Sequence, residues 1–167
     1  MVPLLGVGRE GEVGRPRRGP DKAEQTFCGL RTRLKMMSGD EVDMFKFPTP
    51  KWHMHDGGRY IGTGMIAITK DPDEGWVNCG TYRCMIHDEK TLSFYASPGK
   101  HATIMREKYW AKGESCPVVM CFGQEMLLYS LATISLPWGA SEFEMAGFLS
   151  GKPVKVVKGK ATGLPIP

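Results

Sequence analysis

The stretch that decides the fold class is residues 76–96, WVNCGTYRCMIHDEKTLSFYA. Its apolar runs from Trp76 to Ile86 and from Leu92 to Ala96 flank the polar connection 87–90, which has the length of a hairpin turn. Runs of this kind on either side of a short polar connection are typical of neighbouring antiparallel strands. The stretch therefore predicts an antiparallel pair.

Further strands and helices are expected on both sides of this pair. The expected strands are Tyr60–Thr69, Cys116–Phe122 and Val154–Val157, and the expected helices are His101–Lys112, Met126–Ala132 and Ser141–Leu149. The last helix has the clearest boundaries, because Ser141 and Glu144 form a capping box and Gly151 with Pro153 ends the helix. Antiparallel strands interspersed with helices predict an α+β domain with a barrel-like sheet.

The positive charge of the chain lies in its first 38 residues. The formal net charge is +4 over 167 residues; residues 1–38 hold eight Lys or Arg and four Asp or Glu, whereas residues 39–167 hold fourteen of each sign. This Gly/Pro/Arg-rich leader shows neither helical nor strand periodicity, so we expect it to be solvated and poorly ordered. A basic arm that binds nucleic-acid phosphates is the less favoured alternative.

Cysteine usage and hydropathy favour a cytoplasmic protein. The five cysteines have no regular spacing, which is typical of reduced thiols. A zinc site at Cys79, Cys84 and His87 is disfavoured, because on one extended strand the two thiols would point to opposite faces. No apolar run approaches the ~18 residues that a membrane helix needs. The opening MVPLLGVG is too short for a signal peptide and lacks the basic residues with which a signal peptide begins.

Arg83 is the first residue for which the sequence predicts a chemical role. It lies in a strand that is expected to bury one face, where an unpaired cation is strongly disfavoured. Arg83 therefore needs an anionic partner, such as a carboxylate, a phosphate or an acidic substrate. The alternative is an exposed side chain on the outer face of the sheet, and spacing alone does not decide between the two.

A phosphate site and a metal site are also candidates. Ser97–His101 forms a strand-to-helix junction whose backbone N–H groups and lysine suit a phosphate, although many such loops look similar. Glu142 lies in the first turn of the capped helix, where the helix dipole alone could account for a carboxylate. With Asn78 and His101 it forms a donor set suited to Mn²⁺ or Mg²⁺. Spacing does not show that these three residues converge.

A series of short motifs occurs in unbroken order between residues 39 and 167. The motifs are 52–64 (WHMHDGGRYIGTG), 71–73 (DPD), 75–83 (GWVNCGTYR), 97–101 (SPGKH), 141–142 (SE), 145–147 (MAG), 152–154 (KPV) and 164–167 (LPIP). Together they resemble the UbiD family of decarboxylases. Several independent motifs in one order are far more specific than any motif alone.

The resemblance implies a split β-barrel of the flavin-reductase type with flanking helices, truncated at its C-terminus. It implies prenylated FMN as the cofactor, which acts as an electron sink while CO₂ leaves a hydroxybenzoate-type aromatic acid. It also implies Mn²⁺, with K⁺ as a further candidate ion. A flavin prenyltransferase would supply the cofactor, and the full-length protein would be a homo-oligomer. The alternative is a flavin-binding module without decarboxylase activity of its own.

The matching motifs also imply which residues form the site. Asn78, His101 and Glu142 would hold Mn²⁺ at the cofactor phosphate, and Arg83 would be the catalytic residue beside the substrate carboxylate. The implied cofactor contacts are Thr81, Tyr82, Arg83, Tyr95, Ala96, Ser97, Lys100 and His101. Because Asn78 and Arg83 have opposite parity on one strand, we expect a bulge or turn at Gly80.

Three departures from the family pattern bear on these expectations. The family's acidic pair, which includes the proton donor, would follow Pro167. The family's N-terminal α/β region has no counterpart in residues 1–38. Met126 stands where the family commonly has proline, which leaves the start of that helix open. The expected organisation is therefore a leader over residues 1–38 and a partial prenylated-FMN-binding domain over residues 39–167.

Overall fold

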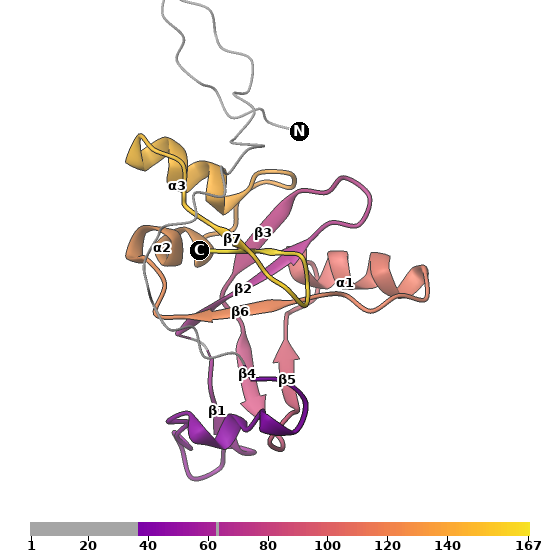
Figure 1. Cartoon of the computed structure of the whole chain (residues 1–167), viewed down its shortest axis with the longest axis vertical. Coiled ribbons are helices and arrows are strands. Elements are labelled where there is room, and N and C mark those ends of the chain that lie inside the picture. Colours follow the sequence, from indigo (N-terminus) through magenta and orange to yellow (C-terminus); the bar gives the residue numbers. More distant parts are fainter. Residues whose placement is uncertain (1–36, 63) are drawn as a thin grey trace, which may run out of the picture.

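A computed structural model describes residues 37–62 and 64–167 of the chain (Figure 1). The predicted leader therefore lies outside the described residues, except for Met37 and Ser38. From residue 39 onward, the description covers the whole predicted cofactor-binding domain apart from residue 63.

The described residues form short strands interspersed with helices, which confirms the predicted α+β class. The strands are β1 Arg59–Tyr60, β2 Met65–Lys70, β3 Val77–Gly80, β4 Arg83–Ile86, β5 Leu92–Tyr95, β6 Val119–Phe122, β7 Val157–Lys158 and β8 Pro165–Ile166. The α-helices are α1 His101–Ala111, α2 Met126–Ala132 and α3 Glu142–Ser150, and two 3₁₀ turns, Gly39–Glu41 and Met44–Lys46, precede the first strand. None of these helices has the length and apolarity that a membrane crossing requires.

The central sheet has the strand order β3-β2-β6, and both pairs are antiparallel. Strand β2 lies in the middle and is buried along nearly its whole length. Its alternate residues serve two apolar clusters: Ile66 and Ile68 pack against α2 and α3, whereas Met65 and Ala67 pack with Tyr82 and the start of α1. Alternate side chains of a strand point to opposite faces, so both faces of this sheet carry a core. Figure 1 shows α2 and α3 beside each other on one side of it.

A second sheet has the strand order β1-β4-β5, again antiparallel. It contains the predicted hairpin: Ile86 pairs with Leu92, and the N–H of His87 donates to the carbonyl of Thr91 at 2.9 Å. The hairpin prediction is therefore confirmed. The third sheet is the small antiparallel pair β7–β8. No closed barrel is formed within residues 37–62 and 64–167.

The prediction of one strand over Trp76–Ile86 is wrong. Strand β3 belongs to the central sheet and β4 to the second sheet, with Thr81 and Tyr82 as the connection. There the N–H of Thr81 donates to the carbonyl of Ala132 at 3.3 Å instead of to a neighbouring strand. The expected turn therefore lies directly after Gly80. The sequence did not reveal a change of sheet, because side chains on both sides of the break enter apolar cores.

The other predicted boundaries are corrected in a similar way. Tyr60–Thr69 is divided into β1 and β2, which belong to different sheets. The strand predicted from Cys116 begins only at Val119, after Pro117, which has no N–H to donate to a ladder. The predicted strand Val154–Val157 shares only Val157 with β7.

The observed helix ends test the predictions made from capping residues. Ser141 is the N-cap of α3, but its predicted half of the capping box is wrong, because the Ser141 side chain makes no capping hydrogen bond. Gly151 ends the helix as predicted, with a left-handed φ of 69°. Helix α2 begins at Met126 without a proline, since the Glu125 side chain accepts a hydrogen bond from the N–H of Leu128 at 3.1 Å.

Candidate metal and cofactor site

Asn78 occupies the middle of β3, opposite Thr69 of β2, and is 2% exposed. Its amide nitrogen lies 3.4 Å from the hydroxyl oxygen of Thr69. Its carbonyl oxygen Oδ1 faces the Nδ1 atom of His101 at 3.1 Å. A predicted ligand of the sheet and a predicted ligand of α1 are thus brought into direct contact.

Glu142 is the first residue of α3 and is 1% exposed. Its Oε2 atom accepts a hydrogen bond from the backbone N–H of Cys79 at 2.7 Å. Burial raises the pKa of Glu142 to about 7, although hydrogen bonds from the N–H groups of Cys79 and of Glu142 itself act in the opposite direction. Within the described part of the chain Glu142 forms no ion pair. A buried carboxylate without a cation is costly and is typical of functional sites.

His101 is the first residue of α1 and is half-buried. Burial lowers the pKa of His101, and the positive charge of neighbouring Lys100 lowers it further. Both effects favour the neutral imidazole, which is the form that binds a metal ion. The ring also packs edge-to-face against the indoles of Trp76 and Trp138.

A cavity of about 100 Å³ brings the three predicted metal ligands together. Six of the predicted site residues are in its lining: Asn78, Thr81, Tyr82, Lys100, His101 and Glu142. The lining also includes Gly80, predicted as a turn, and Gly99 of the predicted phosphate loop. Sequence reasoning missed the other lining residues, which are Cys79, Ala132, Thr133, Ile134 and Ser135. The last four follow or end α2, and no periodicity or motif marked them as facing a site.

Gly80 is required where β3 leaves the central sheet, because the Tyr82 ring folds back over it. A Cβ atom at position 80 would lie 2.5 Å from Tyr82 Oη and 2.6 Å from a ring carbon. Tyr82 is 7% exposed, and burial raises the pKa of its phenol, partly opposed by hydrogen bonds from Asn78 and Ala102. The glycine therefore lets an aromatic wall lie close to Asn78.

Lys100 and the start of α1 form the polar side of the cavity. The ammonium of Lys100 donates to the hydroxyl of Ser135 at 2.9 Å, while the residue itself remains exposed. Lys100 is the N-cap of α1 and provides no side-chain cap. A lysine beside a helix start is a suitable environment for a phosphate. The N–H groups of Thr103 and Ile104 already donate to the carbonyl of Lys100, which leaves the N–H of His101 as the nearest free donor in the described part of the helix start.

The structure does not bring the remaining predicted residues into this cavity. Arg83 and Tyr95 are cross-strand partners, and both side chains are exposed. Ala96 is buried in the core, and the carbonyl groups of Ala96 and Ser97 accept a bifurcated hydrogen bond from Thr103. Of the two alternatives for Arg83, the exposed side chain is the one observed, so burial does not require an anionic partner. No ion pair of Arg83 occurs among the residues that the structure describes, and its role beside a substrate carboxylate stays a prediction.

The donor set of the cavity fits a hard divalent ion. It offers an amide oxygen, an imidazole nitrogen and a carboxylate, and two of these donors are already 3.1 Å apart. Two ligands at right angles on an ion such as Mg²⁺ lie about 2.9 Å apart. No cluster of three His, Cys, Asp or Glu side chains occurs in the described ranges, since the third donor here is the amide of Asn78. The two thiols of the disfavoured zinc site, those of Cys79 and Cys84, lie in different core clusters.

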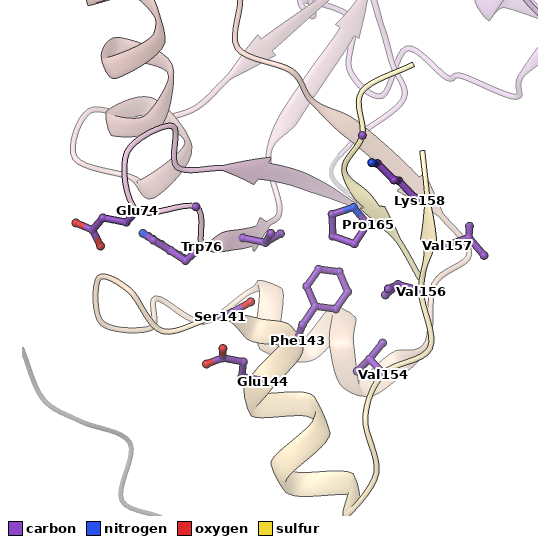
Figure 2. A pocket seen from close by; sticks show the side chains of 13 residues that line it. Glu74, Trp76, Ser141, Phe143, Glu144, Val154, Val156, Val157, Lys158 and Pro165 are labelled. Atoms are coloured by element: carbon purple, nitrogen blue, oxygen red, sulfur yellow. The ribbon is translucent and has the colours of Figure 1, made fainter. Parts of the chain in front are cut away.

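A larger cavity, of about 410 Å³, lies beside the first turn of α3 (Figure 2). The side chains of Phe143 and Pro165 point toward each other there, with Val154 and Val156 nearby. None of the predicted site residues is in its lining. Its lining is mixed, since the apolar side chains are accompanied by those of Glu74, Ser141, Glu144 and Lys158.

Comparison with known sequences identifies the family. The family model "3-octaprenyl-4-hydroxybenzoate carboxy-lyase Rift-related domain" (UbiD) matches residues 30–167. Pyrrole-2-carboxylic acid decarboxylase of Pseudomonas aeruginosa is 36% identical over 77% of this chain, and ferulic acid decarboxylase 1 of Candida dubliniensis is 30% identical over 78%. The chain belongs to the UbiD family. It spans about a quarter of the length of these relatives, 26% of each.

Solved structures agree with this assignment. The UbiD-class enzyme HmfF of Pelotomaculum thermopropionicum, in an evolved dimeric form in complex with prFMN, is similar with a TM-score of 0.72 and 26% identity. The match covers 77% of this chain and 30% of HmfF. Vanillic acid decarboxylase of Sedimentibacter hydroxybenzoicus, in its closed form, has a TM-score of 0.69 and 25% identity over 80% of this chain and 28% of that enzyme.

Proposed function

We propose that this chain is the cofactor- and metal-binding part of a prenylated-FMN-dependent decarboxylase that acts on a small aromatic acid. The observation that carries the proposal is the convergence of Asn78, His101 and Glu142 on one cavity. UbiD membership supports it, as do relatives that are named as decarboxylases of pyrrole-2-carboxylic and ferulic acids. A hydroxybenzoate-type acid is the substrate class that we favour.

In this proposal Asn78, His101 and Glu142 bind Mn²⁺, whose charge offsets that of the buried carboxylate. Lys100 and the N–H group of His101 at the start of α1 bind the cofactor phosphate. Thr81 and Tyr82 wall the cofactor site, and Tyr95, Ala96 and Ser97 line it further along β5 and the loop that follows. K⁺ remains a second candidate ion.

When bound, prenylated FMN supplies the electron sink that loss of CO₂ requires. In this proposal Arg83 binds the substrate carboxylate through charge-assisted hydrogen bonds. The exposed position of Arg83 at the start of β4, one residue after the cavity residue Tyr82, supports this role.

The same proposal has structural consequences. The two three-stranded sheets, joined through Thr81 and Tyr82, would be part of a split barrel of the flavin-reductase type. The full-length protein would be a cytoplasmic homo-oligomer that receives its cofactor from a flavin prenyltransferase.

A flavin-binding module without decarboxylase activity is the second candidate function. The observation that favours it is that Arg83 has no acidic partner among the described residues. In the family the acidic pair includes the proton donor, and a general acid typically contributes 10²–10⁴-fold to a reaction rate. A module without that acid would still bind the cofactor but would turn over very slowly.

Co-production of the chain with a flavin prenyltransferase tests the cofactor. The purified protein is expected to absorb visible light and to contain about one Mn²⁺ per flavin. Adding the rest of the Pseudomonas relative in trans, and measuring CO₂ release from 4-hydroxybenzoate, ferulate and pyrrole-2-carboxylate, separates the two candidates. Release of CO₂ supports the decarboxylase, and flavin binding without release supports the module. A colourless, well-folded protein that takes up no flavin would contradict both.

A further inference from the structure

The imidazole of His101 is enclosed by two indoles. The ring centroids of Trp76 and His101 are 5.3 Å apart at an interplanar angle of 84°, and those of Trp138 and His101 are 5.4 Å apart at 89°. The two indoles also contact each other, at 5.0 Å and 84°. All three pairs are edge-to-face, the arrangement that ring quadrupoles favour. We call Trp76, His101 and Trp138 the aromatic clamp.

Lys108 contacts the aromatic clamp through Trp138. The Nζ atom of Lys108 lies 4.9 Å from the ring centroid of Trp138 and 2.7 Å from Oδ2 of the fully buried Asp71. Nε1 of Trp138 lies 3.5 Å from Oε1 of Glu74. Lys108, which lies on α1, therefore links Trp138 to the connection between β2 and β3, and this connection also contains Trp76.

His101 needs such support because its own position restricts it little. It is the first residue of α1, and Lys100 before it provides no side-chain cap. The one polar contact of its ring within the described part of the chain is Nδ1 to Asn78 Oδ1, at 3.1 Å. Two bulky perpendicular neighbours prevent the ring from rotating away from that contact. Groups that orient a metal-binding histidine typically affect metal affinity 10–100-fold.

We propose that Trp76 and Trp138 are positioning residues that hold the His101 ring toward the metal site, with Lys108 keeping Trp138 in place. The inference rests on the proposed function, since it assumes that His101 binds an ion. Neither tryptophan is in the lining of the small cavity, so neither is a candidate to touch the ion itself.

The test compares Trp138→Leu, Lys108→Met and the control Trp110→Leu in the full 167-residue chain. Trp110 also lies on α1 but is 60% exposed and contacts Arg106 instead of His101. The probe is Mn²⁺ alone, followed by loss of the free-ion electron paramagnetic resonance signal. Trp138→Leu is expected to weaken Mn²⁺ binding about tenfold or more, Lys108→Met by a smaller factor, and Trp110→Leu not at all. Equal affinity of Trp138→Leu and the unsubstituted chain would overturn the proposal.

A second measurement does not need the metal. The contact with Asn78 predicts that metal-free His101 holds its proton on Nδ1, which ¹⁵N NMR of the imidazole reports directly. In Trp138→Leu the ring is expected to populate both tautomers, while Trp110→Leu keeps one. If the unsubstituted chain binds no Mn²⁺ but the tautomer changes in this way, the metal assignment fails and the clamp stands. An unchanged tautomer in Trp138→Leu and in Lys108→Met overturns the clamp; if Trp138→Leu does not fold, Lys108→Met alone decides.

Discussion

The backbone N–H of Cys79 donates a 2.7 Å hydrogen bond to the carboxylate of Glu142, 63 residues later in the chain. This bond joins the first turn of α3 to the central sheet, one residue after Asn78. The carboxylate of Glu142 has almost no contact with solvent, and it forms no ion pair within the described residues. Such a group is expected to respond strongly to pH and to cations.

The stability of the metal-free chain is expected to fall as pH rises between about 4.5 and 7. The pKa of Glu142 is raised from its ordinary value of 4.5 to about 7, mainly by burial, so the folded state binds more protons than the unfolded state in this window. The stabilisation from protonated Glu142 is complete below the window and is lost through its upper end, by about 3 kcal/mol in total.

Urea unfolding at a series of pH values, with a chelator present, measures this effect. Glu142→Gln cannot titrate and should lack the decline, whereas the control Glu107→Gln, which removes an exposed carboxylate, should retain it. Mn²⁺ should oppose the decline, because a metal ligand must be ionised. Parallel pH profiles for the chain and for Glu142→Gln would contradict the prediction.

Gly80→Ala is expected to displace Tyr82 from the cavity. The added methyl group would lie 2.5 Å from Tyr82 Oη, and overpacking of this kind costs about 1–3 kcal/mol of unfolding free energy. The control is Gly64→Ala, where a Cβ atom meets nothing within 4 Å. Equal thermal stability of the two variants would show that Tyr82 does not lie over Gly80.

Lys100→Met is expected to weaken binding of FMN about tenfold, the equivalent of about 1.4 kcal/mol, through loss of one charge-assisted contact to the phosphate. Affinity should also depend less on salt than in the unsubstituted chain. Fluorescence titration with FMN measures both effects, and Lys155→Met, at an exposed position outside the cavity lining, is the control. An unchanged affinity would remove Lys100 from the phosphate site.

The pair Asp71–Lys108 is expected to stabilise the fold more than the neighbouring pair Asp73–Lys112. Asp71 is fully buried, and burial alone would raise its pKa, but the N–H groups of Glu74 and Asp73 and the Lys108 ammonium lower it. Its contribution is therefore present near neutral pH and is lost as pH falls. At pH 7 Lys108→Met should therefore lower the free energy of unfolding more than Lys112→Met does, because the partner of Lys112 is half-exposed and solvent screens that pair. Chemical denaturation of both variants at pH 7 and pH 3 provides the comparison.

The sequence predicted much of the secondary structure, because local signals control it. The hairpin at Ile86 and Leu92 and the ends of α1 and α3 at Gly113 and Gly151 follow from turn residues and left-handed glycines. The change of sheet after Gly80 was not predictable in the same way. It depends on the packing of Tyr82 and on a hydrogen bond from Thr81 to Ala132, both of which link residues through the tertiary fold.

The candidate site was predictable as far as motifs marked it. Asn78, His101 and Glu142 were chosen from motifs and do share one cavity, but Ser135 and Trp138 carry no local signal. They reach the site only because α2 packs against the central sheet and brings the loop that follows it close to the cavity. Arg83 shows the opposite case, since its position on the outer face of β4 follows from a break that the sequence did not reveal.

The most direct test of the metal site is a crystal structure of the chain soaked in Mn²⁺, with anomalous scattering measured at the manganese edge. The proposed metal site predicts one strong peak within bonding distance of Asn78 Oδ1, a ring nitrogen of His101 and the carboxylate of Glu142, and no such peak in Glu142→Gln. A well-ordered crystal with no peak at these three side chains, or with manganese bound only elsewhere, would contradict it.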